Sequence, residues 1–173
     1  MVCLSVTPTA SAEANAYLKV ISSKQGELKG STTAKGHEGQ IVVISTSHEM
    51  TSPYDPGTGL PAGKPIHQPL VITKEMDSTS PQLRTAFDSA ETFTTFKLDY
   101  VRATQTGEVT YLTITLTNAR VAAIRHVMPN NKDSTTAKLN AYENVTFTYD
   151  SIKWASTEGS RSESIANWSQ MVH

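Results

Sequence analysis

The sequence predicts a mainly β domain, an antiparallel barrel or sandwich of strands with one short α-helix beside it. Two observations favour this class. Long stretches alternate between apolar and polar residues, as at Phe96, Leu98 and Tyr100, which is the pattern of a half-buried antiparallel strand. Only one segment, about Ser80–Glu91, has the period of an amphipathic helix. A chain of 173 residues fits one such domain around a single core.

The apolar runs locate the strands in chain order. Gln40–Met50 and Pro69–Met76 are rich in β-branched residues, which pack well on a pleated surface, and they predict two central strands. Asn118 interrupts the alternation and is expected to break or bulge the chain between two strands. The remaining strands are expected at Ala16–Ile21, Phe93–Ala103, Val109–Thr117, Arg120–Met128 and Tyr142–Trp154.

The helix has a start signal and one apolar face. Ser80 is a suitable N-cap and Pro81 suits the first helical position, where its missing N–H costs nothing. The face expected to pack on the strands consists of Leu83, Ala86, Phe87 and Ala90.

The segment Thr51–Ile66 separates the two central strands and has the composition of an irregular arm. Its four prolines remove backbone donors, and its three glycines remove the steric limits that define a helix or strand. A loop this long in a compact domain is usually functional or disordered, and the prolines favour a stiff, extended arm. Tyr54 and Leu60 are its only large apolar side chains before Ile66, so we expect them to anchor any contact.

Composition excludes several classes of protein. The 15 basic and 16 acidic residues give a net charge of −1, so no strong field attracts nucleic acid or an anionic membrane. No apolar run approaches the roughly 20 residues that cross a bilayer, and we expect a soluble domain without membrane insertion. The single Cys3 cannot form a disulfide framework. We expect residues 1–13 to be a disordered leader or an expression remnant, residues 14–155 the domain, and residues 156–173 a tail that is docked or disordered.

No motif predicts a catalytic residue, a cofactor site or a metal site. The Gly57–Lys64 segment differs from a phosphate-binding loop in its glycine spacing, and Pro65 stands where a Ser or Thr should begin a helix. His37 and His48 are each followed by Glu, but neither has the second His that a zinc protease needs four residues on. His48 and His67 flank the arm, yet two imidazoles without a third ligand make a poor metal site. The carboxylates are scattered and indicate no acid–base pair.

Several long motifs occur in an order that resembles a known family. They are GHEGQIVVISTSHEM, DPGTGLPAGKPIHQPLVITKEMDSTSP, LTNARVAAIRHVMPN and YENVTFTYDSIKW. Over about Ala14–Ala155 the chain closely resembles the Hcp family, the haemolysin-coregulated proteins of the bacterial type VI secretion system. The most specific parts are the S-H-E-x-x-S-P to H-x-P segment around the arm and the terminal V-x-F-x-Y-x-x-I-x-W strand.

The resemblance implies an antiparallel β-barrel of two sheets with one flanking helix, and a structural role without catalysis. It implies hexameric rings that stack into the inner tube of a contractile machine and are expelled to deliver effectors. The implied partners are further copies of the chain, a spike protein, the contractile sheath and baseplate, and small effectors in the ring lumen. Such a protein assembles in the bacterial cytoplasm and is then secreted.

Two sets of residues are candidate assembly sites under this resemblance. Ser45, Ser47, Ala122 and Ala123 match strands that face the lumen, although alternation alone cannot separate lumen from core. The candidate contact between rings or subunits is the arm, comprising Thr51, Ser52, Pro53, Tyr54, Asp55, Pro56, Gly57, Thr58, Gly59, Leu60, Pro61, Ala62, Gly63 and Lys64.

Other functions stay open: an effector-binding carrier or chaperone ring, a phage-type tail tube protein, or a small hydrolase.

Overall fold

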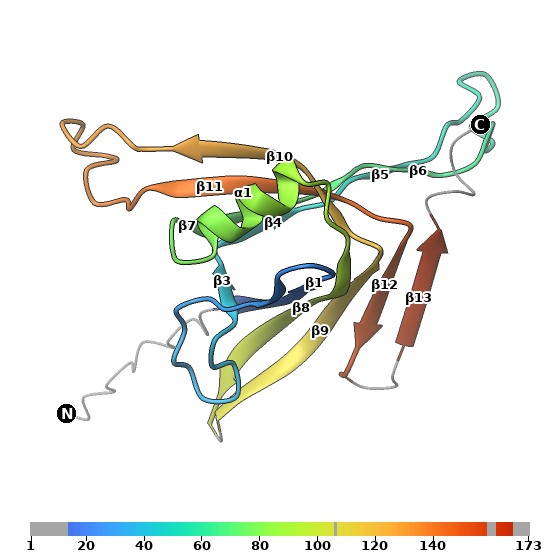
Figure 1. Ribbon diagram of the computed structural model, residues 1–173. Coiled ribbons are helices and arrows are strands. Elements are labelled where there is room, and N and C mark those ends of the chain that lie inside the picture. The colour runs from blue at the N-terminus through green and yellow to red at the C-terminus, as the bar shows by residue number, and fades with distance from the viewer. Residues whose placement is uncertain (1–13, 106, 159–161, 168–173) are drawn as a thin grey trace, which may run out of the picture.

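The computed structural model describes residues 14–105, 107–158 and 162–167, which form thirteen β-strands and one α-helix (Figure 1). The mainly β class with one short helix is therefore confirmed, whereas the expected leader at 1–13 lies outside the described residues. The elements are β1 Ala14–Ser22, β2 Gly26–Leu28, β3 Ile41–Val43, β4 Ser45–Ser47, β5 Met50–Thr51, β6 Ile66–His67, β7 Leu70–Glu75, α1 Ser80–Asp88, β8 Phe93–Thr104, β9 Gly107–Thr117, β10 Arg120–Val127, β11 Tyr142–Thr148, β12 Ser151–Ser156 and β13 Ser162–Asn167.

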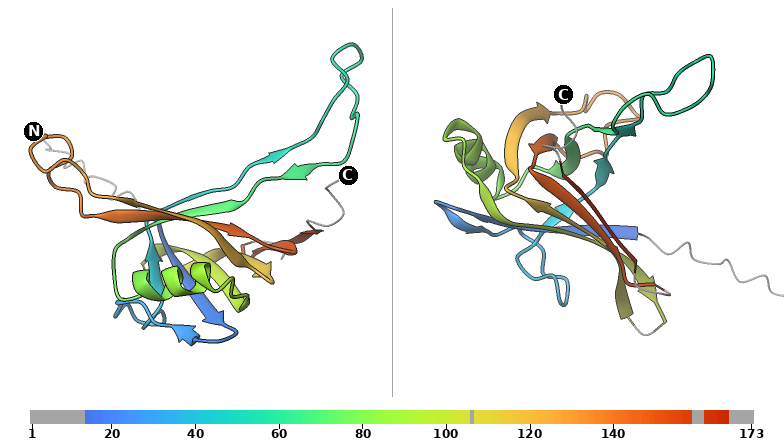
Figure 2. Two further views of the ribbon diagram at one scale, coloured as in Figure 1. Left: turned by 45° about the horizontal axis from the view of Figure 1, so that its top comes forward. Right: turned by 90° about the vertical axis from the view of Figure 1, so that its right-hand side faces the viewer.

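The strands form two main sheets and one small ribbon, and every pairing is antiparallel. The larger sheet has the order β13-β12-β9-β8-β1-β2, with β3 also paired to β1. The smaller sheet has the order β10-β11-β7-β4, and β5 pairs with β6 in the ribbon. Figures 1 and 2 show the two sheets facing each other, with the ribbon extending from one end of the smaller sheet. The expected barrel is thus built as two layers joined by chain segments at their corners.

One corner lies within the first central apolar run. Val43 of β3 pairs with Ala16 in the larger sheet, whereas Ser45 of β4 pairs with Thr73 in the smaller one. Only Ile44 separates them. The predicted strand Gln40–Met50 is therefore wrong as a single element, because the chain changes sheets after Val43 and enters the ribbon at β5.

A second corner lies where β9 ends and β10 begins. Asn118 stands between these strands with a φ of 52°, a left-handed conformation that Asn tolerates better than most residues. The expected break at Asn118 is confirmed. The single strand expected over Tyr142–Trp154 is wrong, because the chain leaves the smaller sheet after Thr148 and enters the larger sheet at Ser151.

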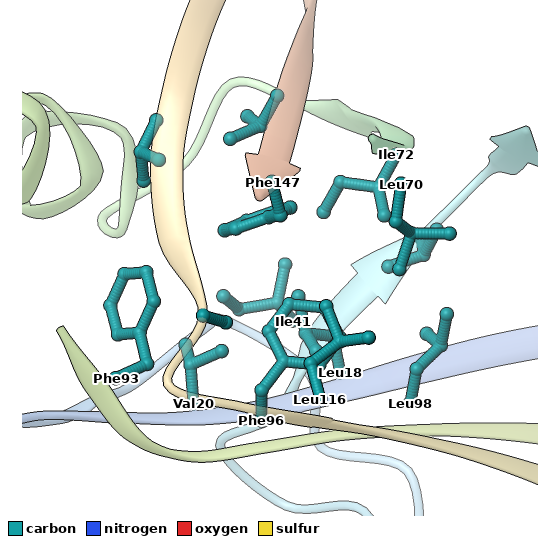
Figure 3. Close-up of a cluster of buried hydrophobic side chains, with 14 of the residues drawn as sticks. Leu18, Val20, Ile41, Leu70, Ile72, Phe93, Phe96, Leu98, Leu116 and Phe147 are labelled. Carbon is teal, nitrogen blue, oxygen red and sulfur yellow. The ribbon is translucent and has the colours of Figure 1, made fainter. Parts of the chain in front are cut away.

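The hydrophobic core fills the space between the sheets (Figure 3). Leu18, Phe96 and Leu98 enter it from the larger sheet and meet Ile72 and Phe147 from the smaller one. The rings of Phe96 and Phe147 pack edge to face with centroids 4.9 Å apart, a favoured aromatic geometry. The period-two alternation predicted for β8 is confirmed at Phe96 and Leu98, which are fully buried, but it is wrong beyond them, where Asp99 and Val101 are buried and the register shifts after Tyr100.

The helix α1 is shorter than expected and is capped differently. Thr79 precedes it and makes no side-chain cap, so the expected N-cap at Ser80 is wrong, and Ser80 is the first helical residue. Leu83 and Ala86 enter the core as predicted, but Phe87 is 39% exposed. With nine residues, α1 is too short to span a bilayer, and the described chain contains no longer apolar helix.

Part of the expected tail is ordered as a strand. Residues Ser162–Asn167 form β13, which pairs along the whole length of β12 and forms one edge of the larger sheet. Its side chains are mostly exposed, including Ile165, whereas Ala166 packs against the core. The rest of the tail beyond Asn167 lies outside the described part of the chain.

Candidate assembly surfaces

The predicted arm is a two-stranded ribbon that projects from the body (Figure 2). Its base is the pairing of Met50 with His67 and of Thr51 with Ile66. Farther out, Tyr54 forms a bridge with Pro61, and the Ala62 amide donates to the Pro53 carbonyl at 2.8 Å. Backbone pairing therefore stiffens the arm, and the expectation that it contains no regular element is wrong at β5 and β6.

A tight turn closes the arm at its tip. The Asp55 carboxylate accepts from the amides of Gly57 at 2.7 Å and Thr58 at 3.0 Å. These two hydrogen bonds stabilise the anion and lower the pKa of Asp55 below its ordinary value. Gly59 has a φ of 70°, which glycine adopts without strain. The amides of Gly57 and Thr58 are thus directed at the Asp55 carboxylate, which holds the turn closed.

The surface of the arm carries apolar side chains that the body does not cover. Every predicted arm residue from Thr51 to Lys64 is exposed. Tyr54 is 67% and Leu60 64% exposed, so the two expected anchors are both available to another molecule. Large apolar side chains on a rigid, protruding ribbon are typical of a surface that is buried on assembly.

A cluster of four rings supports the base of the arm. The rings of His48 and His67 approach as the sequence suggested, with centroids 5.5 Å apart, and Trp154 lies within 6 Å of both. The Tyr149 hydroxyl lies 2.6 Å from Nε2 of His48 and donates to the Gln68 carbonyl. Sequence reasoning missed Tyr149 and Trp154, because only the fold brings β11 and β12 to the arm.

Burial sets the protonation behaviour of this cluster. Desolvation lowers the pKa of both histidines, and for His48 the neighbouring His67 lowers it further. Burial also raises the pKa of Tyr149 to about 12. Nδ1 of His67 is buried without a hydrogen-bond partner in the structure. No group of three His, Cys, Asp or Glu residues that could hold a metal ion occurs within residues 14–105, 107–158 and 162–167.

The candidate lumen residues lie at the two opposite edges of the smaller sheet. Ser45 and Ser47 are on β4, Ala122 and Ala123 are on β10, and all four are exposed. The strands β7 and β11 lie between them, so the four residues are not one cluster. Ala122 sits at a bulge in the register, where β10 has one residue more than β11.

The outward face between these edges is formed by small and polar side chains. One row across the sheet runs from Ser47 through Val71 and Thr146 to Ala123. In the neighbouring row, Thr73 donates to the side-chain oxygen of Asn144 at 2.9 Å. The row through Ser47 and Ala123 therefore has small side chains, whereas the neighbouring rows carry the larger Arg125 and Tyr142.

Both edges of the smaller sheet lack a further strand. In the pairing order, β4 and β10 are terminal, and neither has a second partner among the described strands. Terminal strands present unpaired backbone N–H and C=O groups, which favour pairing with another chain. Two such edges on one sheet allow copies to join side by side.

Sequence reasoning also missed a buried charge cluster between the smaller sheet and α1. The ammonium of Lys74 lies 2.8 Å from Glu143 and 2.9 Å from Asp77, and Lys74 and Glu143 are fully buried. The Ser80 hydroxyl donates to the same oxygen of Glu143 at 2.8 Å. The paired charges fix the start of α1 on the sheet. The alternation along β7 could have revealed these buried charges, because Lys74 follows Ile72 by two residues and therefore lies on the same inward face of the strand.

Comparisons with known proteins agree with this architecture. The family model described as "Type VI secretion system effector, Hcp" matches residues 17–155. The chain is 35% identical over 149 residues to the "Major exported protein" of Pseudomonas aeruginosa, covering 80% of this chain and 87% of that protein.

Solved structures are similar along nearly the whole chain. A crystal structure of an Hcp protein has a TM-score of 0.81 at 24% identity, covering 90% of this chain and 98% of that one. The Hcp1 protein of Escherichia coli EAEC 042 has a TM-score of 0.77 at 29% identity, covering 89% and 98%. The secreted protein Hcp3 of Pseudomonas aeruginosa has a TM-score of 0.69 at 27% identity, covering 90% and 99%.

Proposed function

Because this chain belongs to the Hcp family of the type VI secretion system, we propose that it forms hexameric rings that stack into the inner tube of the secretion machine. The family match over residues 17–155 carries this conclusion. Its role is that of an exported tube subunit. The absence of any motif for nucleophilic or acid–base catalysis supports a structural role over an enzymatic one.

The ring closes through the free edges of the smaller sheet. The β4 edge of one copy faces the β10 edge of the next, and repeating this heterologous contact around an axis closes a ring. The outward face that carries Ser47 and Ala123 then lines the lumen. Near-zero net charge supports this packing, because rings with a large like charge would repel one another.

The arm joins one ring to the next. Its exposed Tyr54 and Leu60 supply apolar contact area, and the bridge between Tyr54 and Pro61 keeps the ribbon extended at low entropic cost on binding. An arm that contacts only its own body would not leave these side chains exposed.

A second role as a carrier of effectors fits the same molecule. The exposed lumen candidates at Ser45, Ser47, Ala122 and Ala123 are small, so a folded cargo can approach the sheet closely. The remaining partners are the spike protein at the tube tip and the sheath and baseplate around it. Assembly takes place in the bacterial cytoplasm and is followed by export.

The solution mass of the purified protein tests the proposal. Light scattering after size-exclusion chromatography should give a mass near six times 18.8 kDa, and negative-stain images of the peak should show annular particles. A stable monomer at high concentration, without rings, would overturn the proposal. The carrier role would then need a different binding surface.

A further inference from the structure

A hollow lies on the outward face of the smaller sheet, at the end where β7 finishes. Its volume is about 560 Å³. Ile44 and Leu139 line it and are 58% and 57% exposed, so its apolar side chains are not covered by the chain's own body. Tyr142 adds an aromatic surface, and the remaining lining residues are Thr73, Glu75, Asn140 and Asn144.

The hollow and the arm lie at opposite ends of the same strands. β4 runs from the hollow at Ile44 toward the arm, and β7 runs back from the arm to the hollow at Glu75. In Figures 1 and 2 the arm projects from one end of the smaller sheet, and the β10–β11 connection, which includes Leu139, projects from the other. When two copies are placed end to end, the arm of one therefore points at the hollow of the other.

The chemistry of the two surfaces is complementary. Lys64 is the only cation of the arm, and none of the ion pairs in the described chain involves it. None of the ion pairs within the described residues involves Glu75, and its carboxylate accepts from the side-chain amide of Asn140 at 3.0 Å. Exposed apolar residues on the arm match the apolar lining of the hollow.

We propose that the hollow is the receptor for the arm of a second copy in the next ring, with Leu60 contacting Leu139 and Lys64 pairing with Glu75. The proposal rests on the proposed function, in which arms join stacked rings, and it adds the place where they bind. A contact between unlike ends repeats without closing, so it generates a linear stack. Each ring contributes several such contacts, and their combined strength exceeds that of one weak contact.

Cysteine cross-linking between two separately purified variants tests the contact. Both carry Cys3→Ser; one adds Leu60→Cys and the other Leu139→Cys. Because the two positions lie at opposite ends of one copy, mild oxidation of the mixed tubes should give a covalent dimer that joins adjacent rings. Leu60→Cys mixed with Phe87→Cys is the matched control, because Phe87 is also exposed but lies on α1, and this mixture should give no dimer.

Charge reversal gives a second, independent measurement. Lys64→Glu and Glu75→Lys should each raise the concentration needed for tube formation by roughly twofold to fivefold, the range for exposed ion pairs. The double variant should restore wild-type assembly, whereas Lys35→Glu, at an exposed site away from both surfaces, should leave it unchanged. If tubes form but the cysteine variants give no cross-link and the double charge variant does not restore assembly, the hollow is not the receptor for the arm. The proposed tube function would then still stand. Failure of the wild-type protein to stack would overturn the proposed function itself.

Discussion

The side-chain amide of Asn118 donates to the carboxylate of Asp150 at 2.7 Å, and this bond joins the two places where the chain changes sheets. Asn118 stands between β9 and β10, and Asp150 between β11 and β12. The Asp150 amide also donates to the Thr117 carbonyl at 2.9 Å. One side-chain pair therefore helps to hold both crossings in register.

Replacing Asn118 should separate the cost of backbone strain from the cost of the lost hydrogen bond. Asn118→Gly removes the bond but permits the positive φ, and it should lower the free energy of unfolding by about 1 kcal/mol. Asn118→Ala adds left-handed strain and should cost about 2 kcal/mol. Urea denaturation measures both values. Equal losses in the two variants would show that strain contributes nothing at this corner.

The buried ion pair should be sensitive to removal of one partner. Lys74→Met leaves Glu143 charged and buried, and should lower the free energy of unfolding by about 3 to 5 kcal/mol. The double variant Lys74→Met, Glu143→Leu should lose less, because no uncompensated charge is left at Glu143. Arg84→Ala, in an exposed pair with Asp88, is the matched control and should change stability by less than about 0.5 kcal/mol. A Lys74→Met variant as stable as the control would contradict the prediction.

The histidines at the base of the arm should make stability depend on pH. Their folded pKa values lie below the ordinary value of 6.5, so the unfolded chain takes up protons first as the pH falls. Their contribution is therefore complete above about pH 6.5 and declines as the pH falls below it toward the folded pKa values. We expect urea midpoints to decrease between pH 7 and pH 5, and His48→Gln or His67→Gln to flatten the decrease.

Trp154 offers a local readout of the same titration, since both imidazole rings lie within 6 Å of it. A Trp168→Phe background leaves Trp154 as the single tryptophan. Its fluorescence should change with pH in this background and change less after either histidine is replaced. An unchanged pH profile in both variants would show that other groups titrate in this range.

The arm variant Tyr54→Ala, Leu60→Ala should separate assembly from folding. Both side chains are exposed, so the free energy of unfolding should stay within about 0.5 kcal/mol of wild type. The concentration needed for ring stacking should rise by at least about tenfold if both residues are energetic anchors. Electron microscopy across a dilution series measures this. Unchanged tube formation would exclude the arm as the contact.

Larger side chains on the lumen candidates should affect cargo without affecting rings. Ser47→Arg or Ala123→Arg places a long side chain on the outward face of the smaller sheet, and should abolish co-purification of an effector while the ring mass is unchanged. Thr85→Arg, on the exposed side of α1, is the matched control. Cargo retention in both lumen variants would place the binding surface elsewhere.

The alternation of apolar and polar residues predicts strands whose burial pattern is visible within a few neighbouring residues. Alternation predicts that Phe96 and Leu98 share one face of β8, and both are buried, because a half-buried strand shows its period within a few residues. The prediction of one strand over Tyr142–Trp154 is wrong at Asp150, where the alternation changes phase: Val145 and Phe147 are buried before the corner and Ile152 after it. Apolar residues on both sides of the corner hide this shift, and the corner's contacts with Asn118 and Thr117 are distant in sequence.

The candidate site was predictable to a similar degree. The arm was evident from its prolines and glycines, and its exposure follows from that composition. The ring cluster at its base was not, because Trp154 reaches His48 only after β12 joins the larger sheet. The helix start was misassigned for the same reason: Ser80 donates to Glu143 on a strand far along the chain instead of capping α1.

The smaller sheet ends in two unlike surfaces, the arm at one end and the hollow beside the β10–β11 connection at the other. A filament that repeats one contact between them has polarity, and its two tips differ chemically. A soluble peptide copied from the arm would occupy hollows at one tip only. It would act as a chain terminator, because a ring whose hollows are occupied cannot accept the arms of the next ring.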